Sequence, residues 1–173
     1  MGETGELWIT GPGMLQGYFG QREAEADAFR GGWFRTGDLF RQDGDGYDYM
    51  LGRIKDVIRR SGENISAAEI EAVVLEIKGV AEAAAVPVPD SVRGEEVKLY
   101  VALPPPHSAA DLSPEQIAAF CRERLAGFKV PRYIEYRALL PRTASNKIAK
   151  EGLRSTGSVL PGSTYDTVAC KWL

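Results

Sequence analysis

Asp38 closes the block Gly32-Trp-Phe-Arg-Thr-Gly-Asp38 and is the first residue whose setting suits ligand chemistry. A carboxylate held at the end of a strand by a glycine turn can accept hydrogen bonds from two neighbouring hydroxyls, such as those of a ribose. An aspartate that only caps a turn explains the pattern equally well. The guanidinium of Arg53 suits phosphate oxygens, but a solvated charge on a strand is the simpler interpretation. The residues alone leave both questions open.

The longest patterned stretch covers residues 52–71. Charged and apolar residues alternate through residues 53–59, which predicts a strand. A tight break follows at residues 61–64, where Gly62 can take backbone angles closed to other residues. Residues 66–69, Ser-Ala-Ala-Glu, have the spacing of a capping box and predict the start of a helix. On spacing alone, this is a surface hairpin that leads into a helix.

Composition sets broad limits on function. The chain has 173 residues, of which 44% are hydrophobic and 26% charged, and its net charge is −3. These values are ordinary for a globular protein of one domain, or of one domain and part of another. The charge provides no basic field for nucleic acid, and the apolar runs are too short for a transmembrane segment. Without signal-peptide character at the N-terminus, the sequence favours a cytoplasmic enzyme or part of one.

Several common chemistries are not supported by the sequence. It contains no Gly-Lys-Ser/Thr, so a Walker phosphate loop is not predicted. The turn at residues 43–46 lacks the glutamate of a calcium loop, since residue 54 is Ile54. The single histidine, His107, lies in a proline-rich stretch, which makes a histidine-based triad implausible. Cys121 and Cys170 do not have metal-ligand spacing, so we expect no metal site and a buried, reduced thiol at Cys121.

The elements that must position these residues form two groups. In residues 1–54, short strands at 5–10, at 33–36 and after 43–46, with a helix at 21–29, do not make a complete core. Residues 55–173 have the pattern of a small α+β unit. Its expected elements are a helix from 66 to about 79, strands at 80–88 and 96–103, a proline linker at 104–108, a helix from Ser113, a strand at 133–140, a short helix at 148–154 and a strand at 165–172.

Three blocks, in this order, resemble one family. They are Gly32 to Asp38; Gly-Arg-Ile-Lys-Asp-x-Ile-x-x-Ser-Gly-Glu-Asn-Ile from Gly52; and Pro141-Arg-Thr-Ala-Ser-Asn-Lys147-Ile. Together they resemble the acyl-adenylate-forming enzymes, most closely the acyl-CoA synthetase branch of fatty-acyl or crotonobetaine/carnitine type. The resemblance implies an α+β fold in which residues 55–173 are the small, mobile C-terminal α/β domain. It implies that residues 1–54 are the β-rich tail of the large N-terminal domain.

The resemblance also implies roles for single residues. Asp38 and Arg53 would bind the nucleotide, and Asn64 corresponds to a position that touches nucleotide in some relatives. Lys147 would be the catalytic lysine, whose ammonium meets the negative charge that develops when a carboxylate attacks the α-phosphate. Asn146 stands where the family usually has glycine, and asparagine tolerates the left-handed backbone such a turn needs. Lys150 is the nearest competitor of Lys147.

Lys55 matches the hinge position of the family. Turning about it would withdraw Lys147 and present Ser61, Gly62 and Glu63 to the active site, where Gly62 would let the pantetheine arm of coenzyme A pass close to the backbone. Two arginines resemble positions that contact the nucleotide end of coenzyme A. These are Arg93 and Arg132.

The implied function is that of an ATP-dependent acid–CoA ligase, which uses ATP, Mg²⁺ and coenzyme A and acts on a fatty or related carboxylic acid. The family's phosphate loop and acid pocket find no match in the chain, so we expect it to need a partner, the large N-terminal adenylation domain, and to be inactive alone. Two alternatives stay open. One is a stand-alone domain that binds nucleotide, coenzyme A or a partner without catalysis, and the other is an adenylation domain that loads a carrier protein.

Overall fold

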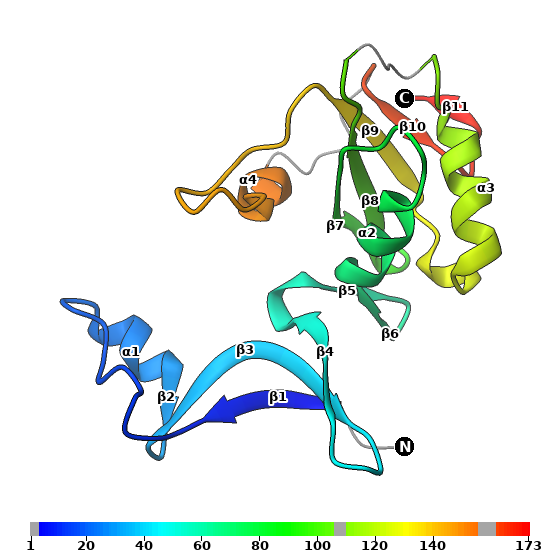
Figure 1. Cartoon of the computed structure of the whole chain (residues 1–173). Coiled ribbons are helices and arrows are strands. Elements are labelled where there is room, and N and C mark those ends of the chain that lie inside the picture. Colours follow the sequence, from blue (N-terminus) through cyan, green and yellow to red (C-terminus); the bar gives the residue numbers. More distant parts are fainter. Residues whose placement is uncertain (1–3, 106–109, 156–161) are drawn as a thin grey trace. The chain divides into compact units, whose positions relative to one another are not determined.

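The computed structural model describes residues 4–105, 110–155 and 162–173, so His107 and part of the proline linker lie outside the described residues. The contacts of the chain fall into two compact units, Met1–Lys55 and Asp56–Leu173 (Figure 1). The mixed α+β class predicted from the sequence is confirmed. We describe each unit by itself.

The first unit is a small antiparallel sheet built around β3 (Trp33–Gln42). This strand pairs with β1 (Thr4–Ile9), β2 (Phe29–Arg30) and β4 (Asp48–Arg53), and α1 (Arg22–Ala28) precedes β2. No side chain of residues 4–55 is buried, and Phe19 and Met50 are exposed. The first unit therefore has a sheet but no core of its own.

The second unit is organised around the long hairpin of β7 (Glu82–Asp90) and β8 (Gly94–Ala102). Its sheet has the order β11-β10-β9-β8-β5-β6, with β7 also paired to β8, and among the described strands only the β8–β9 pair is parallel. The other strands are β5 (Val57–Arg60), β6 (Glu63–Ser66), β9 (Tyr133–Arg137), β10 (Thr164–Asp166) and β11 (Lys171–Trp172).

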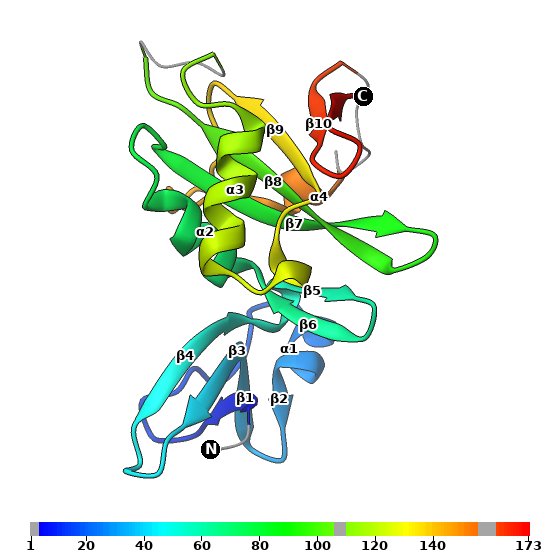
Figure 2. The same ribbon diagram turned by 90° about the vertical axis from the view of Figure 1, so that its right-hand side faces the viewer.

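Helices cover both faces of this sheet. The helices α2 (Ala67–Leu75) and α3 (Pro114–Arg124) lie on one face of the sheet (Figure 2). Their apolar stripes meet Val97, Leu99 and Val101 of β8. The short helix α4 (Lys150–Ser155) covers the other face, where Leu153 packs with Ala84, Val86 and Tyr100. Both faces of the sheet are thus covered around β8.

The capping box predicted at Ser113 is confirmed, because the Ser113 hydroxyl accepts from the Gln116 N–H and the Gln116 side chain accepts from the Ser113 N–H. The one predicted at Ser66 is wrong. Ser66 is the N-cap of α2 by position, but its side chain makes no capping hydrogen bond. The Glu69 carboxylate instead accepts two hydrogen bonds of 2.7 Å from Lys129.

Three predicted strands are also corrected. Residues 53–59 do not form one strand, since a 3₁₀ turn at Ile54–Asp56 separates β4 from β5. The strand predicted to end at Gly37–Asp38 continues to Gln42 through an irregularity at Gly37. Residues 165–172 form a hairpin, because Asp166 accepts hydrogen bonds from the N–H groups of residues 168 and 169 and turns the chain.

Candidate functional site

Asp38 lies on a bulge of β3. Glu6 pairs with Leu39 and Trp8 with Arg35, so the three residues 36–38 face the single residue 7 of β1. Gly37 takes a φ of 71°, which favours glycine, and the Thr36 hydroxyl donates to the Leu7 carbonyl at 2.8 Å and accepts from the Asp38 N–H at 3.0 Å. Bulges of this kind re-aim side chains and are common beside active sites.

Arg53 lies directly opposite Asp38 on β4, so the structure brings together the two residues predicted to bind nucleotide. Arg53 Nε is 2.7 Å from Asp38 Oδ1, and the two side chains are 61% and 23% exposed. An ion pair this exposed contributes about 1 kcal/mol or less. Both groups can therefore exchange this contact for a ligand, with the carboxylate accepting from hydroxyls and the guanidinium donating to phosphate.

Glu6 supports the bulge and was not predicted as part of the site. Its Oε1 accepts from the Gly37 N–H at 3.1 Å, and its Oε2 accepts from the Trp8 indole at 2.8 Å and from Arg35 at 3.1 Å. Partial burial raises the pKa of Glu6, but the hydrogen bonds from Trp8 and Arg35 outweigh it, and the net pKa is lowered. This contact depends on the pairing of β1 with β3, which no local sequence motif reports.

Lys147 lies on a tight loop closed by a β-bridge between Arg142 and Ile148. The Thr143 N–H donates to the Lys147 carbonyl at 2.8 Å, and the Thr143 hydroxyl accepts from the Lys147 N–H at 3.1 Å. Asn146 takes a φ of 63°, so the prediction that asparagine can replace glycine in this turn is confirmed. The loop presents an exposed Lys147 side chain.

Lys150, the competitor of Lys147, is already engaged within the second unit. Its Nζ lies 2.8 Å from Glu71 Oε1 and 3.5 Å from Asp56 Oδ2, and the side chain is largely covered. Of the two lysines, Lys147 is the one that the fold leaves available to a ligand. This is consistent with the role that the sequence motif assigns to it.

The predicted hinge residue Lys55 is exposed and stands within the 3₁₀ turn. After it, β5 and β6 form a hairpin whose two-residue turn is Ser61–Gly62, with φ values of 51° and 85°. Glu63 and Asn64 follow on β6 and are exposed, with Asn64 opposite Arg59. The hairpin predicted from the tight break at residues 61–64 is therefore confirmed, while the ligand roles of these residues stay predictions.

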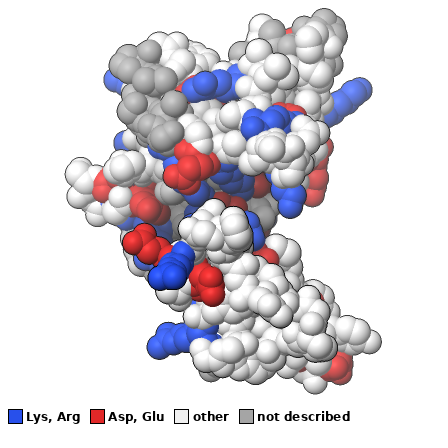
Figure 3. All heavy atoms as spheres, turned by 90° about the vertical axis from the view of Figure 1, so that its left-hand side faces the viewer, with Lys and Arg blue, Asp and Glu red and all other residues white. Residues whose placement is uncertain are grey.

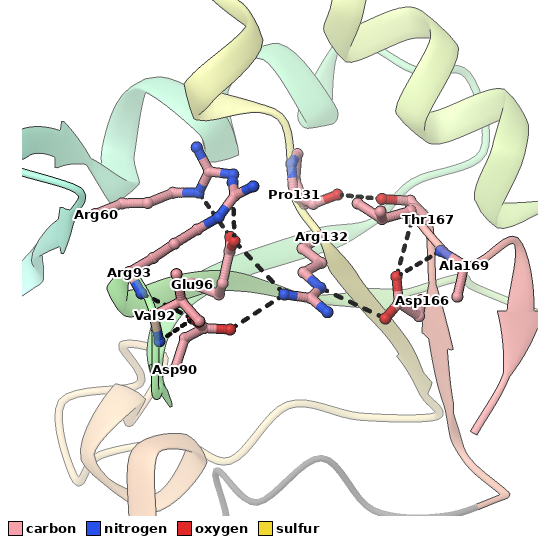
Figure 4. Close-up of polar contacts among 11 residues, drawn as sticks. Arg60, Asp90, Val92, Arg93, Glu96, Pro131, Arg132, Asp166, Thr167 and Ala169 are labelled. Carbon is pink, nitrogen blue, oxygen red and sulfur yellow. Dashed lines mark hydrogen bonds and ion pairs between the residues drawn. The ribbon is translucent and has the colours of Figure 1, made fainter.

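The Ser61 N–H donates to the Arg93 carbonyl at 2.9 Å, which places this turn beside the predicted coenzyme A arginines. Arg93 and Arg132 meet around the fully buried carboxylate of Glu96 (Figure 4). Arg93 Nη1 is 3.2 Å and Arg132 Nη1 3.8 Å from Glu96 Oε1, and Arg60 Nε is 2.7 Å from Glu96 Oε2. Five residues predicted to bind coenzyme A thus lie along one edge of the second unit.

Arg132 has further acidic partners that sequence reasoning missed. Its Nη1 lies 3.1 Å from Asp90 Oδ2 and its Nε 3.4 Å from Asp166 Oδ2 (Figure 4). Carboxylates therefore match the arginines in number, which makes the cluster a neutral network rather than an open basic patch. In the sequence, this cluster shows itself only as a charged residue, Glu96, on a strand whose other residues are mainly apolar.

Basic and acidic side chains also alternate over the face shown in Figure 3, without a broad field of one sign. Within the described residues no group of three or more His, Cys, Asp or Glu side chains is placed to hold a metal ion. None of the helices described is long and apolar enough to cross a membrane.

Residues 69–147 match the family model of the AMP-binding enzyme C-terminal domain. The chain therefore contains a stretch that matches the C-terminal domain of AMP-binding enzymes. It is 41% identical over 153 residues to a feruloyl-CoA synthase from Amycolatopsis sp, covering 88% of this chain and 30% of the relative. It is 40% identical over 154 residues to a long-chain-fatty-acid–CoA ligase from Yersinia pestis, covering 89% and 27%.

A solved structure supports the same relationship. The o-succinylbenzoate CoA synthetase from Bacillus subtilis, in complex with the acyl-adenylate intermediate OSB-AMP, superposes with a TM-score of 0.77 at 38% identity. The match covers 87% of this chain and 30% of that one. The chain therefore spans less than a third of the length of the CoA ligases to which it is similar.

Proposed function

We propose that the chain is the C-terminal part of an ATP-dependent acid–CoA ligase that acts in the cytoplasm. A carboxylate attacks the α-phosphorus of ATP, forming acyl-AMP and releasing pyrophosphate. The coenzyme A sulfur then attacks the acyl carbon, giving the thioester, AMP and a proton. Mg²⁺ accompanies the phosphates of ATP and shields their charge.

In this proposal Asp38 accepts hydrogen bonds from the ribose hydroxyls, and Arg53 donates to ribose and phosphate oxygens. Lys147 meets the charge that develops on the α-phosphate during adenylate formation. Ser61, Gly62, Glu63, Arg93 and Arg132 serve coenzyme A in the second step. Asn64 contributes to the nucleotide side, and Lys55 is the hinge between the two arrangements.

One observation carries this proposal: the Lys147 loop and the arginines predicted to bind coenzyme A contact opposite ends of the β7–β8 hairpin. Arg142, at the base of the Lys147 loop, pairs with Glu82, which lies opposite Ala102 on β8. Glu96, at the centre of the arginines, lies six residues earlier on β8, or about 20 Å at roughly 3.3 Å per residue. A rigid unit cannot present the Lys147 loop and the coenzyme A arginines to one active site at the same time, so it must rotate between the two steps. This supports a hinge at Lys55.

The large N-terminal domain remains a proposed partner, supported by the first unit's lack of a core. We propose that these 173 residues alone form no acyl-adenylate, because nothing in them matches the family's phosphate loop or acid pocket. A fatty or related carboxylic acid remains our prediction for the substrate. Nearly equal identity to a feruloyl-CoA synthase and a long-chain-fatty-acid–CoA ligase means that these residues do not choose between such acids.

The test is a graft. In this graft, the 173 residues replace the corresponding C-terminal part of the o-succinylbenzoate CoA synthetase. ATP–pyrophosphate exchange and thioester formation are then measured with o-succinylbenzoate as the acid. The 173-residue chain alone, after circular dichroism confirms folding, is assayed in parallel. We expect exchange in the graft, none in the chain alone, and a loss of about 10²–10³ in adenylation rate in the graft with Lys147→Met.

Exchange by the chain alone would overturn the proposal that it needs a larger domain. Graft activity that survives Lys147→Met would assign the chemistry to another group. The matched control is Lys171→Met, a lysine of β11 outside the predicted site, which we expect to leave exchange unchanged. An inactive graft whose second unit still binds coenzyme A would favour a non-catalytic binding domain.

A further inference from the structure

Asp56 is the first residue of the second unit and directly follows the predicted hinge residue Lys55. Two cations of α4 hold its carboxylate. Arg154 Nη2 lies 2.5 Å from Asp56 Oδ1, and Lys150 Nζ lies 3.5 Å from Asp56 Oδ2. These contacts join positions almost 100 residues apart in the sequence, so the segment after the hinge is fastened to α4.

Lys150 extends the network to α2. Its Nζ lies 2.8 Å from Oε1 of Glu71, and that same oxygen accepts the Ala85 N–H of β7 at 2.7 Å. Burial raises the pKa of Glu71, and the nearby Lys150 only partly offsets this. We call Asp56, Glu71, Lys150 and Arg154 the hinge anchor; their side chains are only 15–22% exposed.

The anchor also reaches the Lys147 loop. Helix α4 begins three residues after Lys147, and between them Ile148 packs against the apolar cluster under α4. The Ala149 N–H donates to the Pro141 carbonyl at 2.7 Å, which closes the base of the loop. A shift of α4 would therefore move the loop.

We propose that Asp56 is a positioning residue for Lys147: through Lys150 and Arg154 it makes the hinge, α4 and the Lys147 loop move as one body. This rests on the proposed function, since it assumes that Lys147 is carried by rotation at Lys55. Asp56 touches no reacting atom in this scheme. Its carboxylate fixes the direction in which the loop leaves the hinge.

The charges of the anchor make it a connection that one substitution can break. Its two carboxylates and two cations balance, and all four are mostly withdrawn from solvent. Asp56→Asn keeps the size of the side chain but removes the carboxylate that both cations share, so that Lys150 keeps Glu71 and Arg154 keeps Glu151 as separate partners. Such partly buried networks are sensitive to loss of a single member.

The first experiment uses the 173-residue chain and does not depend on its function. Hydrogen exchange is measured by mass spectrometry for residues 142–149 and for α3 in the wild type and Asp56→Asn. We expect exchange in residues 142–149 to be at least about tenfold faster in Asp56→Asn, with α3 unchanged. Glu69→Gln, which removes an exposed ion pair of the neighbouring helix α2, is the matched control and should change neither.

Unchanged exchange in residues 142–149, or equal acceleration in α3, would overturn the proposal, because Asp56 would then be irrelevant to the loop or would only support global stability. The second experiment uses the graft. We expect Asp56→Asn to slow acyl-adenylate formation about tenfold or more, leave thioester formation from supplied acyl-adenylate unchanged, and be largely rescued by Asp56→Glu.

Equal slowing of both steps would overturn the positioning role even if exchange changes in the loop. A wild-type graft that makes no acyl-adenylate would count against the proposed function, whereas the exchange experiment would still decide whether the anchor holds the loop. The two failures are therefore distinguishable.

Discussion

Lys98 and Glu135 form an ion pair inside the second unit, between the parallel strands β8 and β9. Lys98 Nζ lies 2.7 Å from Glu135 Oε2, and the side chains are 0% and 3% exposed. Glu135 has further partners, because Arg137 Nε donates to its Oε1 at 2.6 Å and the Thr164 hydroxyl to its Oε2 at 3.3 Å. The Lys98 ammonium also lies 4.8 Å from the centre of the Tyr100 ring.

Because the Glu135 carboxylate holds Lys98, Arg137 and Thr164, we expect its loss to cost more than the loss of Lys98. Glu135→Leu removes the carboxylate that faces a fully buried ammonium, so we expect it to lower the free energy of unfolding by about 3–5 kcal/mol. Lys98→Met should cost less, about 1–3 kcal/mol, because Glu135 keeps Arg137 and Thr164. The double variant should unfold close to the wild type, since a buried pair can be exchanged for apolar residues of similar volume at little cost.

Urea unfolding followed by circular dichroism measures all three variants. At a slope of about 2 kcal/mol per molar, a loss of about 4 kcal/mol lowers the midpoint by about 2 M. Glu69→Gln, at an exposed ion pair, is the control and should cost about 1 kcal/mol or less. Equal single costs that simply add in the double variant would refute the reasoning, because they would show that the two buried charges do not depend on each other.

Three further predictions concern single positions. Asn146→Ala should lower the free energy of unfolding by about 1–2 kcal/mol because alanine is strained at a φ of 63°, whereas Asn146→Gly should be nearly neutral; equal urea midpoints for the two variants would contradict this. The thiol of Cys170 should react with a disulfide reagent at pH 8 in the folded chain while Cys121 stays protected, because burial raises the pKa of Cys121 from its usual value of 9.0 to about 11. Since the unfolded chain then loses this proton at lower pH than the folded one, the free energy of unfolding should fall as pH rises from about 9 to about 11, and Cys121→Ser should make that fall smaller. In the graft, Asp38→Asn should raise KM for ATP about tenfold or more, with little change in KM for the acid. The expected size follows from the loss of a hydrogen bond to a charged group, roughly 1.5–3 kcal/mol. A change confined to KM for the acid would count against a nucleotide role.

The two predicted capping boxes show why a local sequence pattern can succeed at one site and fail at another. Both have a serine followed three residues later by a residue that can close the box, and only the one at Ser113 forms. At Ser66 the third residue, Glu69, is taken by Lys129, 60 residues further along the chain. A distant partner that competes for a side chain is invisible to a four-residue pattern.

The strand β8 shows that the pattern of a whole strand is limited in the same way, because it does not report which other segments cover the strand. Val97, Leu99 and Val101 stand two residues apart in the sequence, and the structure buries all three on one face. The opposite face, with Glu96 and Lys98, would be expected to face solvent, yet neither residue is exposed. Arginines and a glutamate from other elements pair with these charges, and α4 covers the same face further along, which the period of one strand cannot report.

In the candidate site, too, some features depend on local sequence and others on contacts between distant segments. The turn at Ser61–Gly62 follows from Gly62, so local sequence was enough to predict it. The turn at Asn146 was predicted from the family resemblance, and the left-handed backbone of Asn146 agrees with it. The pairing of Asp38 with Arg53, the support from Glu6 and the hinge anchor depend on contacts between distant segments. Only the family resemblance pointed to the first of these, and nothing in the sequence pointed to the other two.

The difference in burial between the two units decides where each part of the site can be tested. Buried apolar area is the main source of folding free energy, and residues 4–55 bury no side chain completely. The bulge that positions Asp38 therefore rests on a sheet that we expect to be only weakly stable by itself, so its ligand contacts should be measured in the graft. The Lys147 loop and the hinge anchor are attached to a unit with a buried apolar cluster on each face of its sheet, and their geometry should persist in the 173-residue chain. A loop whose protection from exchange differs between that chain and the graft would show that the rest of the ligase also shapes it.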